Sequence, residues 1–202
     1  MTIGIALKDK KNHRIIIGTD RQATLGDEIQ ATVKKKYVCR ELEIIDGYEN
    51  VIGTRKIYFI LAGWGFLDGF LEYKFKIPPI NENINFIDYL YTCLLSDLKT
   101  QLMDEKLLGL KEDKFNSESN VLIIYDGEIY ELTNSFGIDH VHTDYAVIWS
   151  GWKVAIGSLY TNLHYHQHLN RVNMVQQAII SCGVNTIYCD TNSDIHIIYD
   201  YE

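Results

Sequence analysis

The sequence is poor in the residues that interrupt or cross-link a chain. Its 202 residues include only two prolines, adjacent at 78–79, and four cysteines, none of them in a CxxC pair. This pattern indicates neither a zinc ribbon nor a secreted disulfide framework. No apolar run reaches the length of a membrane span, and no charged segment precedes an apolar run at the N-terminus. We therefore expect no signal peptide, no membrane partner and a cytoplasmic protein.

Basic residues are also scarce, with 19 lysines and arginines against 27 acidic residues and a formal net charge of −8. Nucleic acids and anionic membranes attract basic surfaces, so neither class of partner is expected. The composition of 47% hydrophobic and 23% charged residues is typical of a globular protein. Its length fits one domain, 1–202, with a core that needs no disulfides.

Hydrophobic patterning predicts an α+β chain in which strands and helices alternate in blocks. Strands are expected at 2–7, 15–17, 56–63, 120–125, 128–132, 152–156, 185–188 and 195–199, and helices at 65–75, 85–110, 160–169 and 173–181. Asp126-Gly127 is a hairpin signal between two of these strands. The polar segment 38–55 is expected to form an inserted excursion. Helices covering two stacked antiparallel sheets suit this order.

The stretch from Arg14 to Lys36, RIIIGTDRQATLGDEIQATVKKK, organises the rest of the chain. Its β-branched run ends at Gly18, and Asp20 lies where the strand ends. A turn signal and then three lysines follow. An acid at a strand end and a lysine further along can meet in a site if the intervening hairpin folds back. From the pattern alone, Asp20 also fits a turn-capping acid, and the lysines fit a solvated face.

This stretch resembles the opening of proteasome β-type subunits, and most closely the HslV type. Gln22 to Gly26, QATLG, matches that type residue for residue, with the hydrophobic strand, the Asp and the lysines in the same order. The resemblance extends over 56–75, where a strand, an Ala-Gly turn and a helix follow one another. It continues in 155–158, AIGS, and in 181–192. It implies the four-layer αββα sandwich of the N-terminal-nucleophile hydrolases.

The resemblance also implies a threonine-type endopeptidase. In that family the hydroxyl of an N-terminal threonine attacks a peptide carbonyl, and its own α-amine serves as the base. Thr2 becomes that nucleophile if Met1 is removed. Asp20 matches the family Asp. Lys36 matches the family lysine without a gap, and Lys35 matches it if one residue is deleted.

Two further residues are implied by the same comparison, and three departures accompany them. Gly63 matches the glycine whose N–H serves the oxyanion hole, and Ser158 matches the supporting serine. Counted from Asp20, however, Thr2 lies two residues too early for the family spacing. If TIGIALKD is matched instead to the similar strand of archaeal β subunits, Thr2 lies two positions past the nucleophile and no residue occupies the catalytic place. Leu159 replaces the glycine that follows the serine. The family's assisting Asp is also missing, because this chain has Val184 or Asn185 at that position.

Alternatives come from other functional classes. One is a catalytically inactive proteasome-like scaffold or binding protein, and a more distant one is a small-amide hydrolase on the same scaffold. Histidines at 164, 166 and 168, with 140 and 142 upstream, raise the question of a metal, but no HExxH glutamate accompanies them. We expect neither metal nor cofactor. The family further implies a homo-oligomer in the form of a ring, an ATPase unfoldase as partner, and a protein or peptide substrate.

Overall fold

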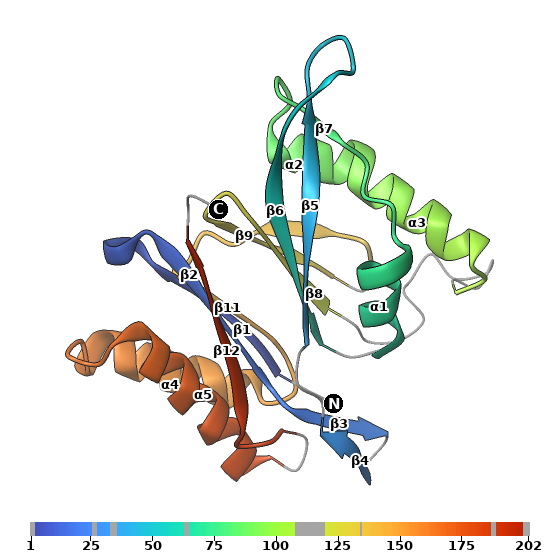
Figure 1. Ribbon diagram of the computed structural model, residues 1–202. Coiled ribbons are helices and arrows are strands. Elements are labelled where there is room, and N and C mark those ends of the chain that lie inside the picture. The colour runs from blue at the N-terminus through green and yellow to red at the C-terminus, as the bar shows by residue number, and fades with distance from the viewer. Residues whose placement is uncertain are drawn as a thin grey trace.

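The computed structural model describes residues 3–25, 28–32, 36–62, 65–107, 120–133, 135–186 and 189–199. Two sheets lie face to face at its centre, with helices on both outer faces (Figure 1). All their described strand pairs are antiparallel except that of β5 (Tyr37–Ile45) with β7 (Ile80–Asn81), which is parallel. No helix in these ranges is long and apolar enough to cross a membrane.

The smaller of the two stacked sheets has four strands in the order β11-β1-β2-β12. These are Tyr145–Trp149, Ile3–Asp9, Arg14–Asp20 and Ser193–Tyr199. A single 3-10 turn, Lys10–Asn12, joins β1 to β2. Both central strands are buried along almost their whole length, so the N-terminal segment forms the middle of the sheet.

The larger sheet has six strands in the order β10-β9-β8-β6-β5-β7. They are Ile138–His140, Glu128–Leu132, Asn120–Tyr125, Val51–Ala62, Tyr37–Ile45 and Ile80–Asn81. A separate two-stranded ribbon, β3 (Gln22–Leu25) with β4 (Glu28–Thr32), follows β2. The segment 38–55, expected to be an excursion, lies in the long β5–β6 hairpin, which projects beyond the other strands (Figure 1).

Helices α4 (Trp152–Tyr165) and α5 (Arg171–Asn185) cover the four-stranded sheet. The six-stranded sheet is covered by α1 (Gly65–Gly69), α2 (Phe86–Tyr89) and α3 (Leu95–Asp104), with π-helical segments at Phe70–Lys74 and Leu90–Leu94. The predicted helix over 85–110 is therefore a continuous run of helical segments to Asp104. Residues 108–110 lie outside the described residues.

Three hydrophobic layers hold the four structural layers together. Ile15 and Ile17 of β2 pack against the facing sheet, whereas Ile16 packs under α5, as the two-residue period of a strand requires. A third layer fills the space between the six-stranded sheet and α1–α3, with Tyr89 fully buried in it. The αββα sandwich expected from the sequence is confirmed.

Two local predictions have opposite outcomes. The β8–β9 hairpin is confirmed, and its turn residues Asp126 and Gly127 have φ values of 50° and 74°, the type I′ geometry that this dipeptide favours. The strand expected at 152–156 is wrong, because α4 begins at Trp152 and the strand is β11. Gly151, at φ 81°, separates the two elements. The strand expected at 185–188 begins inside α5, and 187–188 lie outside the described residues.

Candidate functional site

The structure brings Asp20 and Lys36 together inside the protein. Asp20 is the last residue of β2 and Lys36 immediately precedes β5, and both are buried. Lys36 Nζ donates to Asp20 Oδ1 at 2.8 Å and also to the carbonyl oxygen of Gln22. The ribbon formed by β3 and β4 connects them, so the chain leaves β2 and returns to its end. A buried ion pair of this kind needs such additional hydrogen bonds to offset the loss of water.

Three backbone N–H groups complete the surroundings of Asp20. Ile3 donates to Oδ1 at 3.0 Å, and Gln22 and Asp190 donate to Oδ2 at 3.3 and 3.2 Å. One carboxylate therefore ties the start of β1, the end of β2 and the segment before β12 to the lysine. The carboxylate oxygens of Asp20 thus accept from three backbone N–H groups as well as from Lys36.

Burial shifts the acid–base properties of two neighbouring groups. Desolvation lowers the pKa of Lys36 below its usual value, although the charge and hydrogen bond of Asp20 oppose this change. Desolvation raises the pKa of Asp68, in α1, to about 6, although the nearby Lys36 charge opposes that change. A lysine that loses its proton more readily and a carboxyl that titrates near neutral pH are typical of reactive sites.

The raised pKa of Asp68 makes the stability of the folded protein depend on pH. Between its usual pKa of 3.8 and about 6, Asp68 binds more protons in the folded than in the unfolded state, so this group's contribution to stability falls as pH rises through that window. We expect Asp68→Asn to remove this part of the decline, which makes the variant gain stability relative to the parent between pH 4.5 and 7. Urea unfolding at both pH values measures the difference. Glu43→Gln, on an exposed position of β5, should show no such gain, and equal behaviour of the two variants would contradict the assignment.

Two buried thiols lie near enough to Asp20 to be affected by its charge. Cys182 and Cys189 donate to the carbonyl oxygens of Gly151 and Ser150, each at 3.3 Å. Burial raises their pKa values to about 12 and about 11. Both thiols are therefore neutral at physiological pH. They hold the turn between β11 and α4 in place and do not act as nucleophiles.

A close backbone approach fixes the segment that donates to Asp20. A Cβ placed on Gly183 would lie 2.6 Å from the backbone nitrogen of Thr191 and 2.7 Å from the carbonyl carbon of Asp190. Gly183→Ala should push this segment away and destabilise the protein by roughly 1–3 kcal/mol. Urea unfolding measures the change. The matched control is Gly157→Ala in α4, where a Cβ meets nothing within 4 Å, so the alanine should be neutral or stabilise by up to about 1 kcal/mol. Equal effects of both alanines would contradict the close-approach argument.

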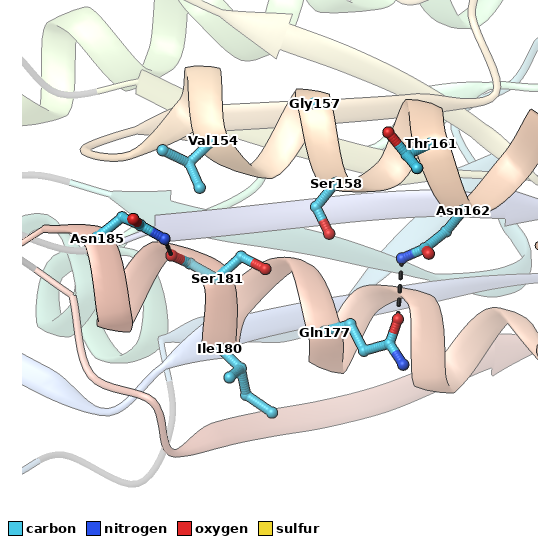
Figure 2. A pocket seen from close by; sticks show the side chains of 9 residues that line it. All are labelled: Val154, Gly157, Ser158, Thr161, Asn162, Gln177, Ile180, Ser181 and Asn185. Carbon is cyan, nitrogen blue, oxygen red and sulfur yellow. Dashed lines mark hydrogen bonds between the residues drawn. The ribbon is translucent and has the colours of Figure 1, made fainter.

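The other residues implied by the sequence are not all part of this arrangement. Thr2, Lys35 and Gly63 lie outside the described residues. Ser158 lies in α4 and lines a groove of about 480 Å³ between α4 and α5, opposite Ser181 (Figure 2). Neither Asp20 nor Lys36 lines this groove. The structure therefore does not bring Ser158 to the ion pair.

The groove also contains Asn185, which stands near the position of the family's assisting acid. Its side chain donates to the carbonyl oxygen of Ser181 at 2.7 Å, and Asn162 donates to Gln177 at 3.1 Å (Figure 2). The amide of Asn185 is thus used to hold the end of α5. Among the described residues, no three His, Cys, Asp or Glu side chains gather in a way that could hold a metal ion.

A second serine, Ser150, lies in the turn between β11 and α4. Ser150 follows β11, whose last residue Trp149 is paired with Ile3, the residue that donates to Asp20. Ser150 therefore lies beside the start of β1. A signal was available, because Ser150 is followed by Gly151, which is the Ser-Gly order of the family run, whereas Ser158 is followed by leucine.

The fold of this chain is similar to those of several solved structures. No family model and no curated protein sequence matches the chain. BPH from Thiobacillus denitrificans, a bacterial proteasome homologue solved in complex with epoxomicin, is similar with a TM-score of 0.73 and 16% identity over 98% of each chain. HslV from Trypanosoma brucei is similar with a TM-score of 0.61 and 12% identity, over 98% of this chain and 99% of the HslV chain. Anbu from Yersinia bercovieri is similar with a TM-score of 0.63 and 12% identity, over 98% of this chain and 81% of the Anbu chain.

These similarities define the class of protein by its fold. The chain has the fold of the proteasome-type N-terminal-nucleophile hydrolases over essentially its whole described length. The structures that it resembles are BPH, HslV and Anbu, which agrees with the resemblance to the HslV type carried by the QATLG segment. At 12–16% identity the likeness is one of fold, and the chemistry has to be argued from the site.

Proposed function

We propose that this protein is an N-terminal threonine endopeptidase in which Thr2, exposed by removal of Met1, is the nucleophile. One observation carries the proposal: the buried Asp20–Lys36 pair is held against the backbone N–H of Ile3. Thr2 is the residue directly before that N–H in the chain. The threonine amine of a Met1-free chain would therefore be one residue away in sequence from the N–H that donates to Asp20.

The chemistry follows from the two functional groups of an N-terminal threonine. Its α-amine, with an ordinary pKa of about 8, takes the hydroxyl proton as the oxygen attacks the peptide carbonyl. The proton passes to the departing amine, an ester is left on the threonine, and water then hydrolyses that ester. Lys36 would lower the pKa of the amine through its positive charge and stabilise the negative charge that develops. Asp20 positions Lys36.

The remaining roles are assigned by position. We assign Gly63 to the oxyanion hole, because a residue without a side chain lets its N–H approach the developing charge. We assign the supporting hydroxyl to Ser150 in place of Ser158, since Ser150 lies beside the start of β1. Lys35 remains the alternative to Lys36 only if the Asp20–Lys36 contact is not the functional one.

We also propose that the protein assembles with copies of itself in a ring, with substrate supplied by an ATP-driven unfoldase. Large apolar side chains exposed on α4 and α5 support self-association. These are Trp152, Tyr160, Tyr165, Ile180 and Val184. Exposed apolar groups gathered on one layer are typical of interaction surfaces.

The experiment that tests the peptidase function varies only the N-terminus. The protein is produced from a cleavable fusion that leaves Thr2 first, and in parallel with one extra residue before Thr2. The Thr2-first protein should cleave small fluorogenic peptides, and the extended protein should not, because it has no threonine amine. If neither form cleaves peptides, the catalytically inactive scaffold becomes the better account.

A further inference from the structure

A second pocket lies at the opposite end of β1 from the Asp20–Lys36 pair. It has a volume of about 530 Å³ and is formed by the β1–β2 turn and the connection between α4 and α5. Strand geometry puts Asp9, at this end of β1, about 20 Å from Ile3 at the other end. The pocket is therefore separate from the candidate active site.

The charges around this pocket are opposite to those of the chain as a whole. Its basic lining residues outnumber its acidic ones by five to two, although the chain carries a formal net charge of −8. The basic residues are Lys8, Lys10, Lys11, Arg14 and Arg171, and the acids are Asp9 and Asp144. Lys8 is paired with a third acid, Glu128, which is not a lining residue, at 2.6 Å. A local excess of positive charge in an acidic protein attracts anions.

Both acids of the pocket already have basic partners. Asp9 is buried and accepts hydrogen bonds from Arg14 Nε and from the side chain of Asn12, both at 2.8 Å. Although burial opposes its charge, these bonds hold the pKa of Asp9 below its usual value. Lys10 pairs with Asp144 at 2.7 Å. The charges of Arg14 and of Arg171 also lower the pKa of Asp9.

Two cations of the pocket, Lys11 and Arg171, form no ion pair in the part of the chain that the structure describes, although the charge of Arg171 also acts on Asp9. Lys11 is exposed at the β1–β2 turn and has no ion pair there. Arg171 Nη1 donates to the sulfur of Met174 at 3.2 Å, which is a neutral acceptor. These side chains come from segments far apart in the sequence, yet they line the same pocket. Their charges are available to a ligand.

The beginning of α5 adds to the same field. This helix has 15 residues and starts at Arg171, and Asn170 caps it by accepting from the N–H of Asn173 at 2.8 Å. One cap satisfies one N–H, so other first-turn N–H groups keep hydrogen-bonding capacity at the positive end of the helix. Arg171 and Asn170 both line the pocket, so the helix start and the unpaired cations act on the same space.

We propose that this pocket binds a phosphate-bearing anion, held by Lys11, Arg171 and the first turn of α5. Guanidinium and ammonium groups with a helix N-terminus form the donor set that phosphate oxygens prefer. The volume is in the range of small-ligand pockets and holds a diphosphate or a nucleotide. The inference is independent of the peptidase function, because it uses no residue of the Asp20–Lys36 site.

The test is isothermal titration calorimetry of the full chain with inorganic phosphate, pyrophosphate and metal-free ATP at matched ionic strength. We expect saturable 1:1 binding of at least one of them. The double variant Lys11→Gln/Arg171→Gln should weaken it by roughly 10- to 100-fold, the loss for two charge-assisted contacts. Tighter binding of ATP than of pyrophosphate would identify a nucleotide as ligand, and equal binding would identify the phosphate groups alone.

The control is Lys76→Gln, which removes an exposed lysine outside the pocket and should leave the affinity unchanged. Circular dichroism of each variant establishes that it is folded. Should the double variant fail to fold, Lys11→Gln alone, at the exposed turn, should still weaken binding by severalfold. Absence of saturable binding of all three anions to the parent, or unchanged affinity in the folded pocket variant, would overturn the proposal.

Discussion

Lys36→Ala is expected to lower the rate of peptide cleavage by about 10²-fold or more. Without the ammonium group, the threonine amine loses the charge that lowers its pKa, and the charge developing in the transition state is left uncompensated. The measurement is kcat/KM for a fluorogenic peptide with Thr2-first protein. Lys35→Ala should change the rate much less, since it is Lys36 that contacts Asp20. The reverse order of these two effects would favour the alignment with a deleted residue.

A loss of stability has to be separated from a loss of catalysis in this experiment. Removing Lys36 leaves the buried Asp20 carboxylate without a counter-charge, which typically costs about 3–5 kcal/mol. The double variant Asp20→Asn/Lys36→Met contains no unpaired buried charge and should be more stable than Lys36→Met alone. Both variants should be inactive under conditions in which each is folded. Activity in the folded double variant would show that the pair serves stability only.

Thr2→Ala is expected to abolish cleavage while the fold and its stability remain unchanged. The substitution removes one hydroxyl and leaves the α-amine, Asp20 and Lys36 in place, so only the nucleophile is lost. Thr2→Ser retains a hydroxyl on the same carbon and should keep measurable activity. The comparison is made by peptide cleavage at equal protein concentration, with urea unfolding to establish equal stability. If Thr2→Ala cleaves the peptide as fast as the parent protein does, the activity belongs to another residue or to a contaminant.

Much of the fold could be predicted because its signals are local. The β-branched run before Asp20 and the Asp126-Gly127 turn specify a strand and a hairpin through their own backbone preferences. The segment 152–156 misled for the same reason, since its valine and isoleucine favour a strand locally. Its helical conformation depends on Ala155 and Leu159, one turn apart, which pack against the four-stranded sheet. In this segment, tertiary packing therefore outweighs the local preference for a strand.

The site was less accessible to sequence reasoning, because its contacts join distant segments. The resemblance supplied Asp20 and Lys36 as candidates, but the N–H donated by Asp190 comes from 170 positions away and involves no characteristic side chain. Our proposal of Ser150 in place of Ser158 rests on the pairing of Trp149 with Ile3, a contact between segments 146 positions apart. The pocket proposed to bind a phosphate-bearing anion is lined by both Lys11 and Arg171, which are 160 positions apart, and no sequence periodicity predicts that.

The most direct test of the central claim is an intact-mass measurement on the Thr2-first protein after incubation with epoxomicin, the compound held by the similar BPH structure. The proposed function predicts a denaturation-stable mass increase of one epoxomicin per chain. It predicts no increase for Thr2→Ala or for the form with one extra residue before Thr2. An unmodified Thr2-first protein that also fails to cleave peptides would contradict the claim that Thr2 is an active nucleophile beside the Asp20–Lys36 pair.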